Sequence, residues 1–449
     1  MFLLVFIGWN VANALRHPDH KLAMGHDLLP SYAAGTLVRK GTPRLMYERA
    51  AVQAVESRTI LDADLEMDAR YGPWLNPPFF AWVFAPLSAL PYRTAAAVFL
   101  CVNMLLLAGS LVLLTRMFLS RRMHRDSSPA YCSPSASSSR SGAENLQSAV
   151  AKVPWQAWAL VPLLAILPLP FWQALCHQQN TFISLLLLAA ATTCWRRGWG
   201  FRAGVFAGLL FFKPQLAAVF SLTLVIGLGW RALAGLALTG AALLAVTLIT
   251  LPGCLGAFLH NLPPTLHWLQ MEAPYNWGRQ VTFQSFWRLL IQGHTRGETQ
   301  TIVKMLWWLC SGTAIAGVAL AAWRHLRGGR PTASCDRLIA ASIAAMPLVM
   351  PYYMDYDLLL LSIPAVLFAA EWTHRRDAIM RADRWLLAAW GLFCFETFFN
   401  PGLAGHSRLN LGVPLIAMIS VLHTVRCLRR DFQQTVNVQP AQTMRAIAA

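Results

Sequence analysis

Long apolar blocks separated by short basic segments constrain this chain more than any other feature of its sequence. Residues 94–114, 232–251 and 302–323 are three such blocks, and each reaches the roughly 20 residues that a helix needs to cross a bilayer. Apolar residues make up 56% of the chain and charged residues 13%, which leaves too little polar surface to coat a soluble globule. No run of short alternating segments indicates a membrane barrel. We therefore expect an all-α, polytopic transmembrane protein with roughly ten to twelve membrane helices, some of them short or re-entrant.

The basic residues lie between these blocks and give the chain a formal net charge of +17. The main groups fall at 121–125, 196–202, 324–330, 375–384 and 426–430. This spacing follows the positive-inside pattern, in which Lys and Arg flank membrane helices on the cytoplasmic side. A nucleic-acid reader would instead gather its basic residues on one face beside a recognition module. We expect a multi-pass protein of the bacterial inner (plasma) membrane, surrounded by membrane lipids, with no nucleic-acid partner.

Polar segments divide the expected membrane domain, which covers 1–430. Taking the basic groups as cytoplasmic assigns each segment to a side of the membrane, because every full crossing changes side. The segments are a first periplasmic loop at 16–76 that carries short helices, a disordered cytoplasmic linker at 120–152, a second periplasmic loop at 252–301 and a cytoplasmic tail at 431–449. The linker is expected from its Ser, Pro and Gly bias and its lack of periodic apolar residues.

Two of the apolar segments are irregular. Residues 1–15 are short for a crossing, and we expect them to form the first membrane helix. Residues 203–230 are apolar except for Lys213, Pro214 and Gln215 in their middle. This interruption predicts a broken or re-entrant pair of half-helices rather than one straight crossing.

Four polar groups lie at or near membrane level, where ionisable side chains are costly and are usually paired, cavity-lining or functional. They are found at residues 25–27, 177–180, 213–215 and 351–357. The expected topology places three of them on the periplasmic side and leaves the depth of Lys213 open. That convergence favours a functional site.

Each group also has a purely structural explanation. Taken alone, a helix N-cap accounts for Asp27 better than catalysis does. Capping and recognition of sugar hydroxyls account equally well for residues 177–180. A functional role is favoured for Lys213, because an unpaired buried lysine would be expelled or deprotonated. Helix-dipole stabilisation and an interfacial tyrosine belt are the alternatives for Asp355 and Asp357.

Several motifs, in their order along the chain, resemble glycosyltransferase family 87, the DUF2029 group of GT-C fold enzymes. They are HDLLPSYAAGTLVRKG, LNPPFF, HQQNTFISLLLL, AGLLFFKPQLAAVF and PYYMDYDLLLL. The resemblance implies a GT-C-type fold and a polyprenyl-phosphate sugar donor that carries mannose or another hexose. It also implies transfer to a lipid or glycan acceptor on the external, periplasmic face.

The resemblance assigns roles to single residues. Asp27 matches the carboxylate of the first external loop, which is the usual general base of GT-C enzymes. Gln179 and Asn180 match a family Gly-Gln-Asn pattern, and Lys213 belongs to a matching Lys-Pro pair. Gln178 departs from the pattern, because a glycine is usual there. The implied reaction is direct displacement with inversion, in which Asp27 takes the proton of the acceptor hydroxyl.

A departing phosphate needs cationic or hydrogen-bonding help, and Arg279 and Lys213 are the leading candidates. We expect no metal and no cofactor, since the donor is a co-substrate with a single phosphate; the DxD at 62–64 is better explained as a solvated loop face. The residues expected to bind substrate are His26, Tyr32, Asn76, His177, Gln179, Asn180, Lys213, Gln215, Arg279, Gln284, Tyr353, Asp355 and Asp357.

Two other functions compete with transfer. A transporter or flippase of lipid-linked saccharides would use the same amide- and aromatic-rich cavity without a base, although no internal repeat supports transport. A structural subunit of an envelope assembly would need neither Asp27 nor Lys213. The sequence leaves the sugar, the acceptor, the carrier length and the oligomeric state open.

Overall fold

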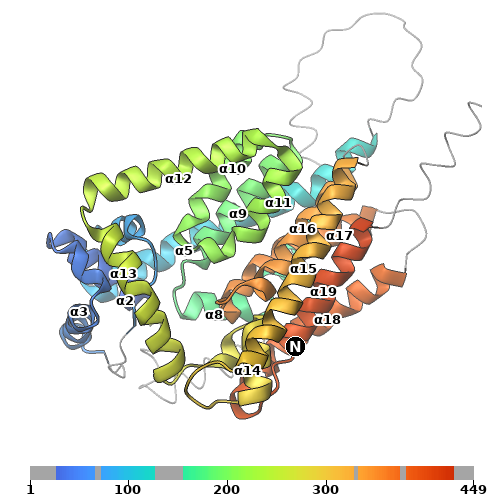
Figure 1. The fold of residues 1–449 in the computed structure, drawn as a ribbon. Helices are drawn as coiled ribbons and strands as arrows, with labels where there is room; N and C mark the ends of the chain where they lie inside the picture. Colours follow the sequence, from blue (N-terminus) through green and yellow to red (C-terminus); the bar gives the residue numbers. More distant parts are fainter. Residues whose placement is uncertain (1–26, 66–71, 127–154, 328–331, 375–380, 429–449) are drawn as a thin grey trace, which may run out of the picture.

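The computed structural model describes residues 27–65, 72–126, 155–327, 332–374 and 381–428. Within these ranges every regular element is a helix and no strand forms, as the apolar blocks predict. The expected helix at 1–15, most of the expected linker and the expected tail lie outside the described residues. Figure 1 shows α15 to α19 packed side by side, with α5 and α9 to α12 beside them.

Among the described residues, four helices are long and apolar enough to cross a membrane. They lie at Tyr92–Ser120 within α5 (Tyr92–Asp126), in α12 (Trp230–Thr250), in α15 (Thr301–Arg327) and at Asp355–Thr373, where the 3-10 helix η9 (Asp355–Leu361) continues into α17 (Ser362–His374). A bent pair, α7 (Trp155–Ile166) and α8 (Leu169–Cys176), makes a fifth if it counts as one span. The expectation of ten to twelve membrane helices therefore stays a prediction, because the remaining apolar helices are shorter.

Exposure separates the peripheral from the central helices. In α5, α12 and α15 only 28%, 28% and 22% of the apolar window is buried, against 83% for the span that begins at Asp355. Apolar side chains that face outward in a membrane protein meet lipid rather than water. Elements η9 and α17 therefore form the centre of the bundle.

The interruption at Lys213 breaks the helix, as predicted. Helix α10 (Gly200–Leu209) ends in the 3-10 turn η5 (Leu210–Phe212), and a second turn, η6 (Pro214–Leu216), leads into α11 (Ala218–Leu228). Lys213 itself takes an extended conformation, with φ −134° and ψ 74°, because a residue before proline is disfavoured in the α region. The chain thus makes two half-helices with Lys213 at their junction.

Helices α10 and α12 approach closely through glycine. A Cβ added at Gly204 would lie 2.1 Å from the carbonyl oxygen of Ala232, and one added at Gly235 would lie 2.1 Å from that of Phe201. Such contacts are characteristic of small-residue helix packing in membranes. This packing holds α10, the half-helix that precedes Lys213, against the lipid-facing helix α12.

Charged side chains tie several helix ends together at one end of the bundle. Arg196, at the end of α9 (Thr181–Arg196), binds Asp336 in the first turns of α16 (Thr332–Val349) at 2.8 Å. Arg426, near the end of α19 (Gly412–Leu428), binds Asp383 near the start of α18 (Arg381–His406) at 2.7 Å and Glu371 of α17 at 3.0 Å. We call this the basic end. The start of α9 and the start of η9 lie at the opposite end.

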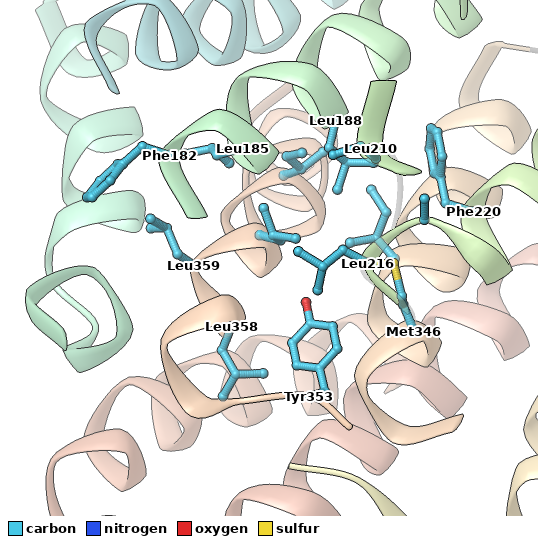
Figure 2. Packing of buried hydrophobic residues seen from close by; sticks show 14 of the residues in the cluster. Phe182, Leu185, Leu188, Leu210, Leu216, Phe220, Met346, Tyr353, Leu358 and Leu359 are labelled. Atoms are coloured by element: carbon cyan, nitrogen blue, oxygen red, sulfur yellow. The ribbon is translucent and has the colours of Figure 1, made fainter. Parts of the chain in front are cut away.

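A continuous apolar core lies between the two ends. Figure 2 shows side chains of α9, the broken segment, α16 and η9 meeting in it. The labelled members are Phe182, Leu185, Leu188, Leu210, Leu216, Phe220, Met346, Tyr353, Leu358 and Leu359. Because helices on both sides of the break contribute, the core fixes the height of Lys213 relative to η9.

The two long polar segments contain short helices, as predicted for 16–76 and 252–301. The first holds α2 (Leu28–Arg39), η2 (Pro43–Tyr47) and α3 (Arg49–Asp62), and it is followed by η3 (Pro78–Phe80), α4 (Ala81–Phe84) and η4 (Leu87–Ala89). The second holds α13 (Cys254–His267), the π-helical turn η7 (Trp268–Glu272), η8 (Trp277–Arg279) and α14 (Phe283–Gln292). Helix α13 packs on η2, where the ring centres of Tyr47 and Phe258 lie 5.4 Å apart; Figure 1 shows where α13 lies in the fold.

Candidate active site

One short segment, residues 173–181, contacts three carboxylates. It comprises the end of α8, a tight turn and the start of α9. The three contacts are Gln173 Nε2 to Asp355 Oδ2 at 2.9 Å, Gln179 Nε2 to Asp27 Oδ2, and Thr181 Oγ1 to Asp357 Oδ1 at 2.5 Å. Segment 173–181 therefore links the start of α2, through Gln179, to η9, through Gln173 and Thr181.

The turn depends on an uncommon backbone conformation at Gln178. Its φ is +53°, in the left-handed region that costs an L-residue roughly 1–2 kcal/mol and costs glycine almost nothing. This explains why a glycine suits the position. The amide side chain of Gln178 is buried, and its Oε1 has no hydrogen-bond partner among the described residues.

Asp27 is the most accessible of the three carboxylates, with its side chain 40% exposed. It occupies the N-cap position of α2 but makes no side-chain cap hydrogen bond, so capping does not account for it. Its Oδ2 accepts from Gln179 and lies 3.8 Å from His177 Nδ1. Its Oδ1 accepts no hydrogen bond from any residue that the structure describes.

Asp355, in contrast, is fully engaged. Arg279 of η8 donates to both of its oxygens, at 2.9 and 3.0 Å, and the backbone N–H of Tyr356 donates to Oδ1 at 2.9 Å. Burial alone would lower the pKa of Arg279, but the Asp355 carboxylate outweighs it and raises that pKa above its usual value. The pair is thus a fixed, charged bidentate contact, with Gln173 as a further donor.

Asp357 forms the third contact, with Lys213. The ammonium lies 3.2 and 3.3 Å from the two carboxylate oxygens and 5.4 Å from the centre of the Tyr356 ring. Both side chains are almost completely buried. The junction of the broken helix therefore lies at the level of η9.

Comparison with known proteins bears directly on this arrangement. The sequence model of glycosyltransferase family 87 matches residues 74–351, which is more than half of the chain. The chain belongs to glycosyltransferase family 87. It is therefore a membrane glycosyltransferase. No curated protein and no solved structure matches it.

The family 87 match covers only part of the three-carboxylate arrangement. The turn at 177–180, Lys213 and Arg279 lie inside the matched residues, whereas Asp27, Asp355 and Asp357 lie outside them. The structure joins the two sets through the hydrogen bonds and ion pairs described above. Each carboxylate outside the match is bound by at least one residue inside it.

Tyr352 is a candidate site residue that the sequence did not single out. It lies half-buried in the short segment between α16 and η9. Burial and the nearby carboxylates Asp27 and Asp357 raise the pKa of Tyr352. Its hydroxyl therefore stays protonated and can donate a hydrogen bond. The alternating PYYMDYD pattern was the available signal, but it did not say which tyrosine faces Asp27.

Tyr353, the tyrosine predicted to bind substrate, is placed differently. Its ring is fully buried in the apolar core below η9 (Figure 2), and its hydroxyl donates to the backbone oxygen of Asp357 at 3.1 Å. Its backbone N–H donates to Gln280 Oε1 at 2.9 Å. Tyr353 therefore supports η9 from beneath and is not open to a ligand in this conformation.

Gln280 is a second residue that the sequence did not reveal. It is 1% exposed, its Nε2 donates to Tyr275 at 2.6 Å, and its backbone pairs with that of Met354. These contacts fasten the loop after η8 to the start of η9. The partners are more than seventy residues away in sequence for Tyr353 and Met354, so no local pattern marks the residue.

The remaining predicted residues are spread more widely. The Tyr32 hydroxyl donates to Leu90 O at 2.8 Å and its ring packs on Tyr92, while the Asn76 backbone oxygen accepts from Tyr47 at 2.9 Å. Within the described ranges no side-chain hydrogen bond links Asn180, Gln215 or Gln284 to the three carboxylates. Asn180 directly precedes Thr181, and Gln215 lies two residues after Lys213; both Thr181 and Lys213 contact Asp357. His26 lies outside the described residues.

Proposed function

We propose that this family 87 glycosyltransferase moves a hexose, in the first instance mannose, from a polyprenyl-phosphate carrier to a hydroxyl group of a lipid or glycan acceptor. Transfer takes place on the periplasmic side of the inner membrane and inverts the anomeric centre. Asp27 is the general base, and no metal takes part. The resemblance of the motifs to the GT-C enzymes of the family supports the donor class and the side of the membrane.

The Oδ1 of Asp27, which accepts no hydrogen bond from the described residues, is the observation that carries the proposal. A general base needs an unoccupied oxygen within reach of the proton that it accepts. Asp355 and Asp357 have their oxygens bound by Arg279 and Lys213, so neither is available. Asp27 is held through Oδ2 alone and is partly exposed, which suits it to this role.

The reaction is a single displacement. The acceptor oxygen attacks the anomeric carbon while its proton passes to Asp27 Oδ1, and the bond from that carbon to the phosphate oxygen breaks. The glycosidic bond forms on the opposite face of the sugar, and polyprenyl phosphate leaves with the electron pair. Gln179 and His177 fix the base during the step, because both contact Oδ2.

The leaving phosphate is stabilised by groups next to the base. Arg279 uses Nε and Nη2 on Asp355, and its Nη1 has no partner among the described residues. The Tyr352 hydroxyl supplies a neutral donor near Asp27 and Arg279. Each cation is paired with a carboxylate, but the Lys213 side chain is 9% exposed and that of Arg279 24% exposed. Lys213 therefore positions η9 and contributes less to binding phosphate than Arg279 does.

The depth of the site suits a lipid carrier. Helix α9 has 16 residues and rises about 24 Å, which is less than the roughly 30 Å of a bilayer core. If the basic end lies at the cytoplasmic boundary, the turn at 177–180 lies at or just within the opposite boundary of the hydrocarbon. A carrier anchored by its polyprenyl chain presents its phosphate at that level.

Transfer from a lipid-linked donor can be tested with the full chain in vesicles. Labelled polyprenyl-phosphate mannose is supplied together with a lipid extract of the host membrane as acceptor, and labelled products are separated from the donor. We expect label in a new lipid or glycan product, and none when a nucleotide sugar replaces the donor. Label that crosses the bilayer while still on its carrier would instead indicate a flippase.

A further inference from the structure

A hollow lies on the second long polar segment, beside the candidate active site. Its volume is about 360 Å³, at the lower end of the roughly 300–1,000 Å³ of small-molecule sites. Its walls come from the loop at 270–277, the loop at 294–296 and Gly405 of α18. None of the residues that form the three-carboxylate arrangement lines it.

The walls combine two aromatic rings with amide and basic groups. Tyr275 and Trp277 meet edge to face, with ring centres 4.9 Å apart. Gln270, Asn276 and Arg296 supply hydrogen-bonding groups beside them. Aromatic faces with neighbouring amides suit a sugar ring, whose C–H faces are apolar and whose edges are hydroxyls.

A fully buried arginine supports this hollow from behind. The guanidinium of Arg288 lies 4.7 Å from the Trp277 ring centre, and its Nη2 donates to the backbone oxygens of Thr295 and Gly297 at 3.0 and 2.9 Å. These contacts connect the two walls through one side chain. The hollow is therefore held open by the fold and is not a chance gap between loops.

The hollow is coupled to the three-carboxylate arrangement through short connections. Trp277 and Arg279 are two residues apart in η8, and Arg279 binds Asp355. The Tyr275 hydroxyl accepts from Gln280, whose backbone pairs with that of Met354 at the start of η9. The hollow is thus joined through η8 and Gln280 to the element that carries Asp355 and Asp357.

We propose that this hollow binds a sugar residue of the acceptor, so that the acceptor of this enzyme already carries at least one sugar. The inference rests on the proposed function for the direction of transfer. The bound sugar stacks on the partly exposed Tyr275, whose ring the buried Trp277 supports, and the amides of Gln270 and Asn276 bind its hydroxyls. The next part of the acceptor extends past Tyr352 and brings the attacking hydroxyl to Asp27.

Two glycines of α18 provide a matched pair of variants. A Cβ added at Gly405 or at Gly402 meets no atom within 4 Å, and both positions have ordinary helical backbone. Only Gly405 lines the hollow. Gly405→Trp therefore fills the hollow, whereas Gly402→Trp adds the same side chain to the same helix outside it. Asn276→Ala removes one amide without adding bulk.

Binding is measured first, without any transfer, by saturation-transfer NMR of the full chain in nanodiscs with methyl mannoside, methyl glucoside and methyl galactoside. We expect at least one of these glycosides to receive saturation from the wild type and from Gly402→Trp, and to lose most of it with Gly405→Trp. Binding that survives Gly405→Trp, or the absence of binding to the wild type, would overturn the proposal.

Transfer kinetics then separate this inference from the proposed function. With the membrane lipid extract as acceptor, Gly405→Trp should raise the acceptor KM about tenfold or more and leave the donor KM unchanged, and Asn276→Ala should raise it about threefold to tenfold. Normal transfer with an unchanged acceptor KM in Gly405→Trp would refute the acceptor subsite alone. No transfer by the wild type would refute the proposed function, while the NMR result would still decide whether the hollow binds sugar.

Discussion

Asp27, Asp355 and Asp357 carry the same functional group, yet their neighbours give them different chemistry. Arg279 and Lys213 occupy the oxygens of Asp355 and Asp357, and a carboxylate bound by a cation on both oxygens is a poor proton acceptor. Among the described residues, Asp27 has amide and imidazole neighbours on one oxygen only. The role of base proposed for Asp27 rests on this difference.

The backbone at Gln178 gives a residue-scale test of the turn. Because φ is positive there, Gln178→Gly should have a free energy of unfolding about 1 kcal/mol higher than that of Gln178→Ala. Gln178→Gly should therefore also unfold at the higher temperature. At a position with ordinary φ the order is reversed, since glycine has the more mobile unfolded chain. Thermal unfolding of the two variants in detergent measures the difference. An alanine variant as stable as the glycine variant would contradict the strained turn.

Glu56 makes a prediction about pH. It is 2% exposed in α3, accepts from the Gly72 N–H at 3.2 Å, and burial raises its pKa to about 8. The folded state therefore keeps a proton that the unfolded state releases near pH 4.5. The stability contributed by the neutral acid is complete below that pH and is lost as the pH rises towards 8.

Glu56→Gln should remove this dependence, because its amide is neutral at every pH and retains an acceptor oxygen. We expect the variant and the wild type to unfold at similar temperatures at pH 5, and the variant to be the more stable at pH 8. Unfolding temperatures measured across this range provide the test. A wild type that gained stability relative to the variant as the pH rose would show that Glu56 is ionised in the fold.

At the scale of elements, the central feature is a broken helix fastened to a 3-10 helix. The break at Lys213 follows from the sequence, because Pro214 prevents a continuous helix and a lysine there needs a partner. The identity of that partner does not follow. Asp357 lies 144 residues away, and several acidic residues at other positions offered the same charge.

The Lys213–Asp357 pair can be measured by a double-mutant cycle. Lys213→Met or Asp357→Leu alone leaves a buried unpaired charge, which should cost about 3–5 kcal/mol of stability. The double variant should recover most of that loss, because no charge then remains unpaired. Free energies of unfolding of the four proteins give the coupling. Additive losses would mean that the two side chains do not interact.

For other elements too, the sequence predicted the local structure but not the contacts between distant segments. The helices of the two polar segments, the turn at 177–180 and the late helices could be predicted from apolar periodicity and turn residues. Tyr353 was expected to bind substrate as part of the polar group at 351–357, but its ring is buried in the core whereas Tyr352 is half-buried. Single-sequence patterns did not distinguish Tyr352 from Tyr353.

The whole molecule has two polar ends with different organisation. At the basic end, Arg337, Glu371, Arg426 and Asp383 form a buried network of alternating charge. At the opposite end, Asp27 remains open. The spacing of basic residues predicted that helix ends would gather in this way, but the pairing of charges within the network was not foreseeable, because it joins helices that are distant in sequence.

The network gives a prediction for the stability of the bundle. Arg426→Met removes the buried cation that binds both Asp383 and Glu371, and should lower the free energy of unfolding by about 3–5 kcal/mol. Arg324→Met, at an exposed arginine that donates to Leu428 O, should change it by less than about 1 kcal/mol. Thermal unfolding in detergent compares the two. Equal effects would argue against a structural role for the network.

Transfer by Asp27→Asn tests the central claim most directly. The wild type and the variant are placed in separate vesicles of the same composition, with labelled polyprenyl-phosphate mannose and the acceptor extract, and a single turnover is followed. Asp62→Asn, at an exposed carboxylate, is the control. The variant should bind the donor normally and transfer the sugar about a hundredfold to ten-thousandfold more slowly. A rate close to that of the wild type would show that Asp27 is not the base.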